Sequence, residues 1–252
     1  MPVYCFILDA TTILQHQPYF YSLLDKNQQA FYQTKTQKRK KQYLFSRLLL
    51  RYALAHCANQ SMDSVDIIEV ESSNPESVFS QKNGLLFTLS HSGNLFSVVV
   101  AKSIVCPYVG VDIECLKPIR DSASVPFIFN GKQKNIFLGL VDDEEKLHYY
   151  YQLWTQKEAL IKAVCGSVFS NAFKASYFHN ADSQNLNVSS CVVKTAFLEE
   201  PQLLSQPAYL SVCSKGDFEL RVSEVYSNDL SLSLDSKKLG VRTTSYVSSL
   251  DE

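Results

Sequence analysis

Two acidic residues between apolar neighbours, Asp112 and Glu114, are the side chains of this sequence best suited to chemistry. In the segment Gly110–Glu114 they alternate with the β-branched residues Val111 and Ile113, a pattern that predicts a buried strand. Residues two apart on a strand point to the same side, so both carboxylates share one face. Two carboxylates that lie side by side and are shielded from water repel each other and need a cation between them.

A third acid follows on a predicted helix. The segment Trp154–Lys162 has the apolar spacing of a helix and places Glu158 and Lys162 one turn apart. Carboxylates from a strand and a helix form an oxygen-rich site that suits Mg²⁺, which keeps positions open for water and phosphate. The lysines that flank the third acid indicate that a polyanion binds with the metal. The alternative interpretation is that Asp112 and Glu114 face outward on an edge strand and that Glu158 and Lys162 form an exposed ion pair.

The composition fits an intracellular globular protein. The chain has 252 residues, of which 46% are hydrophobic, enough for one large domain or two small ones. A net charge of −1 gives no reason to expect a nucleic acid or a membrane surface as partner, and no apolar run is long enough to span a membrane. The N-terminus predicts a first strand rather than a signal peptide. Seven cysteines without a C-x-x-C pair predict reduced thiols in the cytoplasm.

The expected elements alternate in type, which predicts an α+β fold. Helical segments are expected at 18–32, 42–54 and 149–164, with a mixed connector at 115–145. Strands are expected at 85–89 and 95–101, separated by Ser90–Asn94, then at the acidic segment, and near 173–178, 189–197 and 207–213. The serine-rich residues 222–252 are predicted to be a peripheral or disordered tail.

Four motifs in series carry a resemblance to a known family. They are Arg47-x-Leu-Leu, Ser90-His-Ser, Gly110-x-Asp-x-Glu and Trp154-x-x-Lys-Glu-Ala-x-x-Lys. Each motif alone is common, but in this order and spacing they resemble the 4′-phosphopantetheinyl transferases of the Sfp type. The similarity runs from about residue 36 to about residue 214.

The resemblance implies a fold and a reaction. The family is a pseudo-dimer of two similar α/β halves with the active-site cleft between them, here 1–115 and 116–221, with 222–252 as the tail. It transfers the 4′-phosphopantetheine arm of coenzyme A to a serine of an apo acyl or peptidyl carrier protein and releases 3′,5′-ADP. Mg²⁺ is the implied cofactor, coenzyme A the co-substrate and a monomer the implied state.

The resemblance also assigns roles around the acids. Asp112, Glu114 and Glu158 would hold Mg²⁺, which is consistent with the need to neutralise charge when a phosphoryl group is attacked. Lys162 would contact the pyrophosphate and stabilise the leaving phosphate. Glu158, or a water that it orients, would take the proton of the carrier serine.

Four further residues would hold coenzyme A. Arg47 and His91 match positions that bind its phosphates, and the guanidinium of Arg47 suits a terminal phosphate. Ser90 would donate a hydrogen bond to the same phosphates, and Lys157 belongs to the same binding set. The basic run Lys38–Lys41 is either a charged helix start or a rim that meets an acidic carrier helix.

The sequence departs from the family pattern at two positions. Asn74 replaces a lysine that contacts the nucleotide, which predicts weaker coenzyme A binding, and Gln133 replaces a glutamate that has been proposed as the general base. The post-helix glycines are also reduced, to Gly166 alone. Two alternatives therefore stay open: a degenerate family member that binds coenzyme A or a carrier protein without turnover, and a metal-dependent phosphohydrolase.

Overall fold

The computed structural model describes residues 2–68, 78–119, 129, 131–165, 191–198, 204–226 and 243–244. Its helices are α1 (Gln17–Ser22), α2 (Lys26–Gln33), α3 (Gln37–Ala58), α4 (Val78–Lys82), α6 (Gly131–Gly139) and α7 (Asp143–Cys165), with 3₁₀ turns η1 (Ala10–His16) and η2 (Met62–Ser64). Its strands are β1 (Pro2–Asp9), β2 (Leu85–Ser92), β3 (Leu95–Lys102), β4 (Val109–Cys115), β5 (Cys191–Leu198), β6 (Ala208–Lys215), β7 (Glu219–Glu224) and β8 (Thr243–Thr244). This mixture of helices with mainly antiparallel sheets is an α+β fold, as predicted.

The strands form two sheets. The larger has the order β2-β3-β1-β7-β8, in which β1 is antiparallel to β3 and parallel to β7. The smaller has the order β4-β6-β5 and is fully antiparallel. In both sheets the same chain order recurs: a strand, a long helix, and then a hairpin whose second strand pairs with the first strand.

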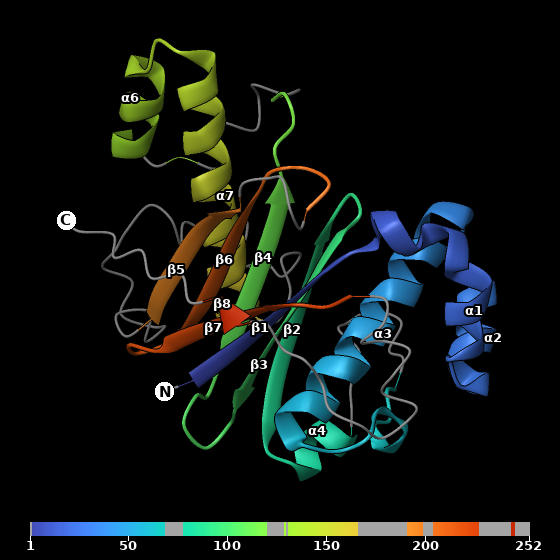
Figure 1. Cartoon of the computed structure of the whole chain (residues 1–252). Helices are drawn as coiled ribbons and strands as arrows, with labels where there is room; N and C mark the ends of the chain where they lie inside the picture. Colours follow the sequence, from blue (N-terminus) through green and yellow to red (C-terminus); the bar gives the residue numbers. More distant parts are fainter. Residues whose placement is uncertain are drawn as a thin grey trace.

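The layers are α3, the larger sheet, the smaller sheet and α7, and apolar cores fill the first two of the three interfaces between them. The first core fills the space between α3 and the larger sheet, where Phe45 packs on Phe96 and Tyr52 packs on Phe6. The second core contains residues of both sheets, so the two sheets pack face to face. The helix α7 covers the outer face of the smaller sheet. Figure 1 accordingly shows α3 on one side of the strands and α6 with α7 on the other.

The main predicted elements are confirmed, with different bounds. The predicted helix at 42–54 lies within α3, the helix at 149–164 lies within α7, and the segments at 85–89, 95–101, 189–197 and 207–213 correspond to strands β2, β3, β5 and β6. The acidic segment is the strand β4. The predicted strand at 173–178 lies outside the described residues.

One local prediction was wrong, and the predicted connector at 115–145 contains additional helical residues. The Ser-His-Ser motif is not a loop, because β2 continues through Ser92 and pairs with β3, and the turn falls at Gly93, whose φ is +60°. The connector contains the helix α6, and α7 begins at Asp143 after the Asp142 carboxylate caps its first turn.

The beginning of the predicted tail lies in the larger sheet. The strand β7 crosses residue 221, the predicted end of the second half, and pairs with β1. Val222 and Val225 are buried, and the backbone N–H of Val225 donates to the carbonyl of Ile7 at 2.8 Å. The short strand β7, with its alternating apolar residues, is therefore part of the sheet, although the composition of this region indicated a tail.

Two further observations concern the described residues only. None of their helices is long and apolar enough to cross a lipid bilayer. Six of their cysteines are free thiols: Cys5, Cys57, Cys106, Cys115, Cys191 and Cys213.

Candidate active site

The absence of a side chain at Gly110 brings α7 against β4. A Cβ atom at this position would lie 2.0 Å from the carbonyl oxygen of Ala159 and 2.6 Å from the backbone nitrogen of Ala163. These are backbone atoms that a small side-chain movement cannot relieve. Gly110 therefore allows the close packing that holds Glu158 and Lys162 over the acidic face of the strand.

Asp112 is at the centre of the site and is only 3% exposed. Its Oδ1 accepts hydrogen bonds from Lys162 Nζ at 2.7 Å and from Ser90 Oγ at 2.7 Å. Lys162 Nζ also donates to Ser90 Oγ at 3.0 Å. The other carboxylate oxygen, Oδ2, is buried without a hydrogen-bond partner. A buried carboxylate oxygen in this state is an open coordination position, because desolvation without a partner is unfavourable.

The other two acids are affected by the same environment. Glu114 accepts from Ser92 Oγ at 2.5 Å through Oε2, and burial together with the nearby charge of Asp112 raises its pKa. Glu158 is 6% exposed, and burial, followed by repulsion from Asp112, raises its pKa to about 7. Lys162 partly opposes that increase. The three carboxylates therefore interact electrostatically across β4 and α7.

A hydroxyl cluster anchors α7 to the smaller sheet behind these acids. Thr155 is completely buried, and its Oγ1 lies 2.9 Å from the Oγ of Ser211 on β6. Ser211 also lies 2.9 Å from Thr195 Oγ1 on β5 and stands opposite Asp112 in the strand register. These contacts hold α7 on the smaller sheet at Thr155, about one turn before Glu158.

The donor chemistry of the site fits a hard cation. Asp112 Oδ2 is a buried oxygen without a partner, and burial, followed by the charge of Asp112, raises the pKa values of Glu114 and Glu158, so a cation here would favour the ionised carboxylates. Among the described residues, however, no three acidic, histidine or cysteine side chains are already grouped closely enough to hold a metal. The ammonium group of Lys162 lies against Asp112 instead. The alternative interpretation, an exposed ion pair between Glu158 and Lys162, does not describe this arrangement, because Lys162 pairs with Asp112 across the interface.

The predicted coenzyme A ligands lie in different places. Ser90 contacts Asp112, whereas the adjacent His91 points to the opposite face of the sheet and stacks on Phe96, with ring centroids 5.9 Å apart. Partial shielding from water, with the charges of Lys162 and Arg39, lowers the pKa of His91. Its imidazole is therefore neutral at pH 7.

Arg47 and Lys157 are both half-buried but lie on different helices. On α3, the guanidinium of Arg47 lies 4.9 Å from the centre of the Tyr43 ring. On α7, Lys157 Nζ donates to Gln133 Oε1 at 3.0 Å, and burial lowers the pKa of Lys157 to about 8. The side chain of Gln133 is thus used to bind this lysine. Asn74 and Gly166, the other family departures, lie outside the described residues.

Sequence reasoning did not assign a role to Thr88 or Ser92, and it did not recognise the packing role of Gly110. Thr88 and Ser92 bond to β4, as described below, and Ser92 also binds Glu114. A signal was available for both: hydroxyl residues at 88, 90 and 92 share one strand face, as the acids of β4 do.

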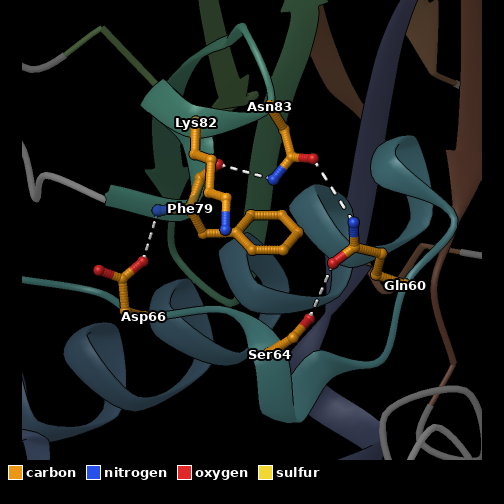
Figure 2. Close-up of a pocket in the computed structure, with 6 residues that line it drawn as sticks. All are labelled: Gln60, Ser64, Asp66, Phe79, Lys82 and Asn83. Atoms are coloured by element: carbon orange, nitrogen blue, oxygen red, sulfur yellow. Dashed lines mark hydrogen bonds between the residues drawn. The ribbon is translucent and has the colours of Figure 1, made fainter.

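A separate shallow pocket lies beside α4 and contains none of the predicted site residues (Figure 2). Four of its polar side chains, those of Gln60, Ser64, Asp66 and Asn83, bind one another or the backbone; for example, Gln60 donates to Asn83 at 3.5 Å and Asp66 accepts from the backbone N–H of Phe79 at 2.7 Å. It therefore adds no group to the carboxylate site.

Comparison with known proteins identifies the region that contains this site. The family model of the 4′-phosphopantetheinyl transferase superfamily matches residues 108–213, which include β4, α7, β5 and β6. The chain is 37% identical over 82 residues to the 4′-phosphopantetheinyl transferase HetI of Nostoc sp., a match that spans 32% of this chain and 33% of that protein. The chain thus spans about a third of the length of HetI.

Two other relatives match over longer segments. The 4′-phosphopantetheinyl transferase AcpT of Escherichia coli is 26% identical over 160 residues, which is 64% of this chain and 74% of AcpT. The AcpT protein of Salmonella typhi is 28% identical over 120 residues, which is 48% of this chain and 59% of that protein. These matches agree with the resemblance carried by the motifs.

Proposed function

We propose, from the match of residues 108–213 to the family model of the 4′-phosphopantetheinyl transferase superfamily, that this chain transfers the 4′-phosphopantetheine arm of coenzyme A to a carrier protein. The acceptor is a serine hydroxyl of an apo acyl or peptidyl carrier protein. Its oxygen forms a bond to the phosphorus that bears the arm, the pyrophosphate bond breaks, and 3′,5′-ADP leaves. The serine proton passes to a base on the enzyme.

One observation carries the proposal. Within the matched region, the buried Asp112 has a lysine ammonium on one oxygen and no partner on the other. This arrangement supplies both a cation for a phosphate and an open oxygen for a metal. An exposed acid or an ordinary helix ion pair would provide neither.

Asp112, Glu114 and Glu158 would hold Mg²⁺ in this proposal. The metal would neutralise negative charge on the pyrophosphate and so favour attack by an oxygen nucleophile. Lys162 already lies 2.7 Å from Asp112, and its ammonium group is placed to bind a phosphate oxygen and stabilise the leaving group. Glu158, or a water that it orients, would take the serine proton.

Coenzyme A would lie between the two halves of the fold. We propose the pseudo-dimer of residues 1–115 and 116–221 with a cleft between them, and the repeated order of strand, long helix and hairpin in the two sheets supports it. Arg47 and His91 would then contact coenzyme A from the first half, and Lys157 and Lys162 from the second. In this division the remainder of the chain, 222–252, follows the second half, and its described parts include the end of β7 and the strand β8, which pair with each other in the larger sheet.

The carrier protein is the second partner in the proposal. At the start of α3, Lys38 and Arg39 are exposed and Lys40 and Lys41 are half-buried, so the helix end offers positive charge to an acidic carrier helix. We further propose that the enzyme acts in the cytoplasm as a monomer.

The test is intact-mass spectrometry of apo carrier proteins incubated with coenzyme A, Mg²⁺ and a catalytic amount of this protein. We expect the carrier to gain the mass of one phosphopantetheine arm. The gain should disappear when EDTA is added or when Asp112→Ala replaces the wild type. Leu49→Ala on α3 is the matched control, because it removes buried contacts on the other helix and should leave transfer intact in the folded protein.

The same experiment separates the alternatives. A phosphohydrolase would release product from coenzyme A without any carrier. A degenerate member would bind coenzyme A or the carrier and add no mass to any carrier tested. Either result would contradict the proposed transfer.

A further inference from the structure

Three hydroxyl groups of β2 bond to the free edge of β4. Thr88 Oγ1, Ser90 Oγ and Ser92 Oγ accept hydrogen bonds from the backbone N–H groups of the facing strand. The donors are Val111 at 3.0 Å, Ile113 at 3.3 Å and Cys115 at 3.2 Å, respectively. Each pair is separated by 23 residues, so the two strands run in the same direction in constant register. Side-chain oxygens here take the place that the backbone carbonyls of a neighbouring strand would fill.

The comparison with β1 shows that this edge is unusual within the molecule. The strand β1 corresponds to β4, because each pairs on one edge with the second strand of the following hairpin. On its other edge, β1 pairs with the backbone of β7. The equivalent edge of β4 has no paired strand among the described residues. The hydroxyl groups of β2 therefore both satisfy buried backbone donors and join the two sheets.

Two of the three hydroxyls have a second task. Ser90 donates to Asp112 Oδ1 at 2.7 Å, and Ser92 donates to Glu114 Oε2 at 2.5 Å, each across 22 residues. The residue at the corresponding offset from Thr88 is Gly110, which has no side chain to accept a bond. Thr88 thus belongs to the same ladder but touches no carboxylate.

The valence of the hydroxyl group determines where its proton points. A serine hydroxyl has one proton to donate and two lone pairs to accept with. At Ser90 both lone pairs are used, by the N–H of Ile113 and the ammonium of Lys162, so the proton goes to Asp112. At Ser92 the N–H of Cys115 occupies one lone pair and the proton goes to Glu114. The backbone of β4 therefore orients the hydroxyls that in turn hold its own acidic side chains.

We propose that Ser90 and Ser92 are positioning residues that fix the carboxylates of Asp112 and Glu114 for metal binding. This inference rests on the proposed function, since it concerns the same metal site. It gives the two serines of the Ser-His-Ser motif a different role from the histidine between them, which faces the opposite side of the sheet. It also leaves Ser90 without a free proton for a phosphate.

The experiment uses the full-length protein freed of metal and Mn²⁺ as the probe, with binding followed by the loss of the free-ion signal in electron paramagnetic resonance. Ser90→Ala and Ser92→Ala remove a ladder bond and a carboxylate bond together. Thr88→Val removes a ladder bond alone and keeps the shape of the side chain. Amide hydrogen exchange at Val111, Ile113 and Cys115 reports the ladder separately.

We expect each variant to speed exchange at its own partner amide by about tenfold. Only the two serine variants should weaken Mn²⁺ binding, by about ten- to a hundredfold, as loss of a group that orients a metal ligand does. Thr88→Val should keep the wild-type affinity within about twofold, and Ser90→Thr, which restores the hydroxyl, should recover most of it. Ser92→Ala, at the end of the strand, provides the same test where Ser90→Ala does not fold.

Two results would overturn the inference. One is unchanged Mn²⁺ affinity in both serine variants, and the other is an equal loss in Thr88→Val, which would indicate a merely structural ladder. A wild-type protein that binds no Mn²⁺ would instead contradict the metal site of the proposed function, and this inference with it. The wild-type measurement therefore distinguishes the two failures.

Discussion

The two long helices α3 and α7 pack on their sheets through interfaces of different composition. The interface of α3 is apolar, whereas that of α7 contains buried acidic side chains. Facing α3, the strand β1 presents Phe6 and Leu8 to an apolar core. Facing α7, the strand β4, which like β1 pairs with the second strand of the hairpin that follows the long helix, presents Gly110, Asp112 and Glu114. The first interface contributes stability through buried apolar area. The second accommodates buried charges that reduce stability, and such an arrangement is characteristic of a functional site.

Replacement of an acid at the α7 interface is expected to have the largest effect. Glu158→Gln keeps the size of the side chain and removes its ability to accept a proton, so we expect transfer to fall by about 1,000-fold. The folded protein should be at least as stable as the wild type at pH 7.5, because a buried charge is removed. Transfer kinetics and urea denaturation would test both parts. Transfer within tenfold of the wild type would exclude Glu158 as the base.

The close helix packing at Gly110 gives the next largest effect. Gly110→Ala places a methyl group 2.0 Å from the carbonyl oxygen of Ala159, so we expect a loss of about 3 kcal/mol or more in the free energy of unfolding. Leu49→Ala, in the core below α3, should lower it by a similar amount, about 3 kcal/mol.

The comparison of these two variants separates packing from chemistry. Measured on the folded proteins, Gly110→Ala should also reduce transfer, because it shifts α7 and its charges, whereas Leu49→Ala should not. Equal transfer by both variants would show that the distance between α7 and β4 is unimportant.

The pH dependence of stability is expected to differ between the acids and the apolar core. The pKa of Glu158 is raised from 4.5 to about 7, so between these values the native state keeps a proton that the unfolded state has lost. Its contribution to stability is therefore complete below pH 4.5 and is lost as the pH rises through about 7.

In the presence of EDTA, the wild type should lose about 3 kcal/mol more than Glu158→Gln between pH 4.5 and pH 7.5, because one pKa unit corresponds to about 1.4 kcal/mol. Urea denaturation over this range would measure the difference. Parallel curves for the two proteins would show that Glu158 has an ordinary pKa.

The smallest effect is expected at the contact between α6 and α7. Gln133→Glu would replace the neutral partner of Lys157 with a carboxylate, where Gln133 Oε1 now accepts at 3.0 Å. We expect a gain of about 0.5 kcal/mol in stability and a higher pKa for Lys157, which burial now lowers to about 8. Denaturation and the pH dependence of lysine acylation at this position would measure them. A lower pKa in the variant would contradict the contact.

The sequence predicted those features that depend on local pattern. Alternation at Val111 and Ile113 predicted β4 and the shared face of its acids, and apolar spacing predicted both long helices. It failed where pairing overrides propensity: Ser90 and His91 are weak strand formers, yet β3 keeps them in β2. In the same way β7 was not predicted, because it lies in a polar region and its partner, β1, is at the other end of the chain.

The contacts within the site depend on tertiary structure and could not be predicted. Lys162 is spaced to pair with Glu158 on the same helix, but it bonds to Asp112 on a strand. The pairing of Ser90 with Asp112 and of Ser92 with Glu114 requires the relative position of two sheets. A glycine before an acid on a strand does not by itself indicate that a helix backbone lies against it.

The most direct test of the central claim is the ratio of the two products. The account predicts that the wild type releases one 3′,5′-ADP for every phosphopantetheine arm attached to the carrier. No 3′,5′-ADP should be released when the carrier is omitted or its serine is replaced. The variant Asp112→Asn should form neither product. Release of 3′,5′-ADP without a carrier, or arm transfer by Asp112→Asn at the wild-type rate, would contradict the assignment of the interface between β4 and α7 as the transferase site.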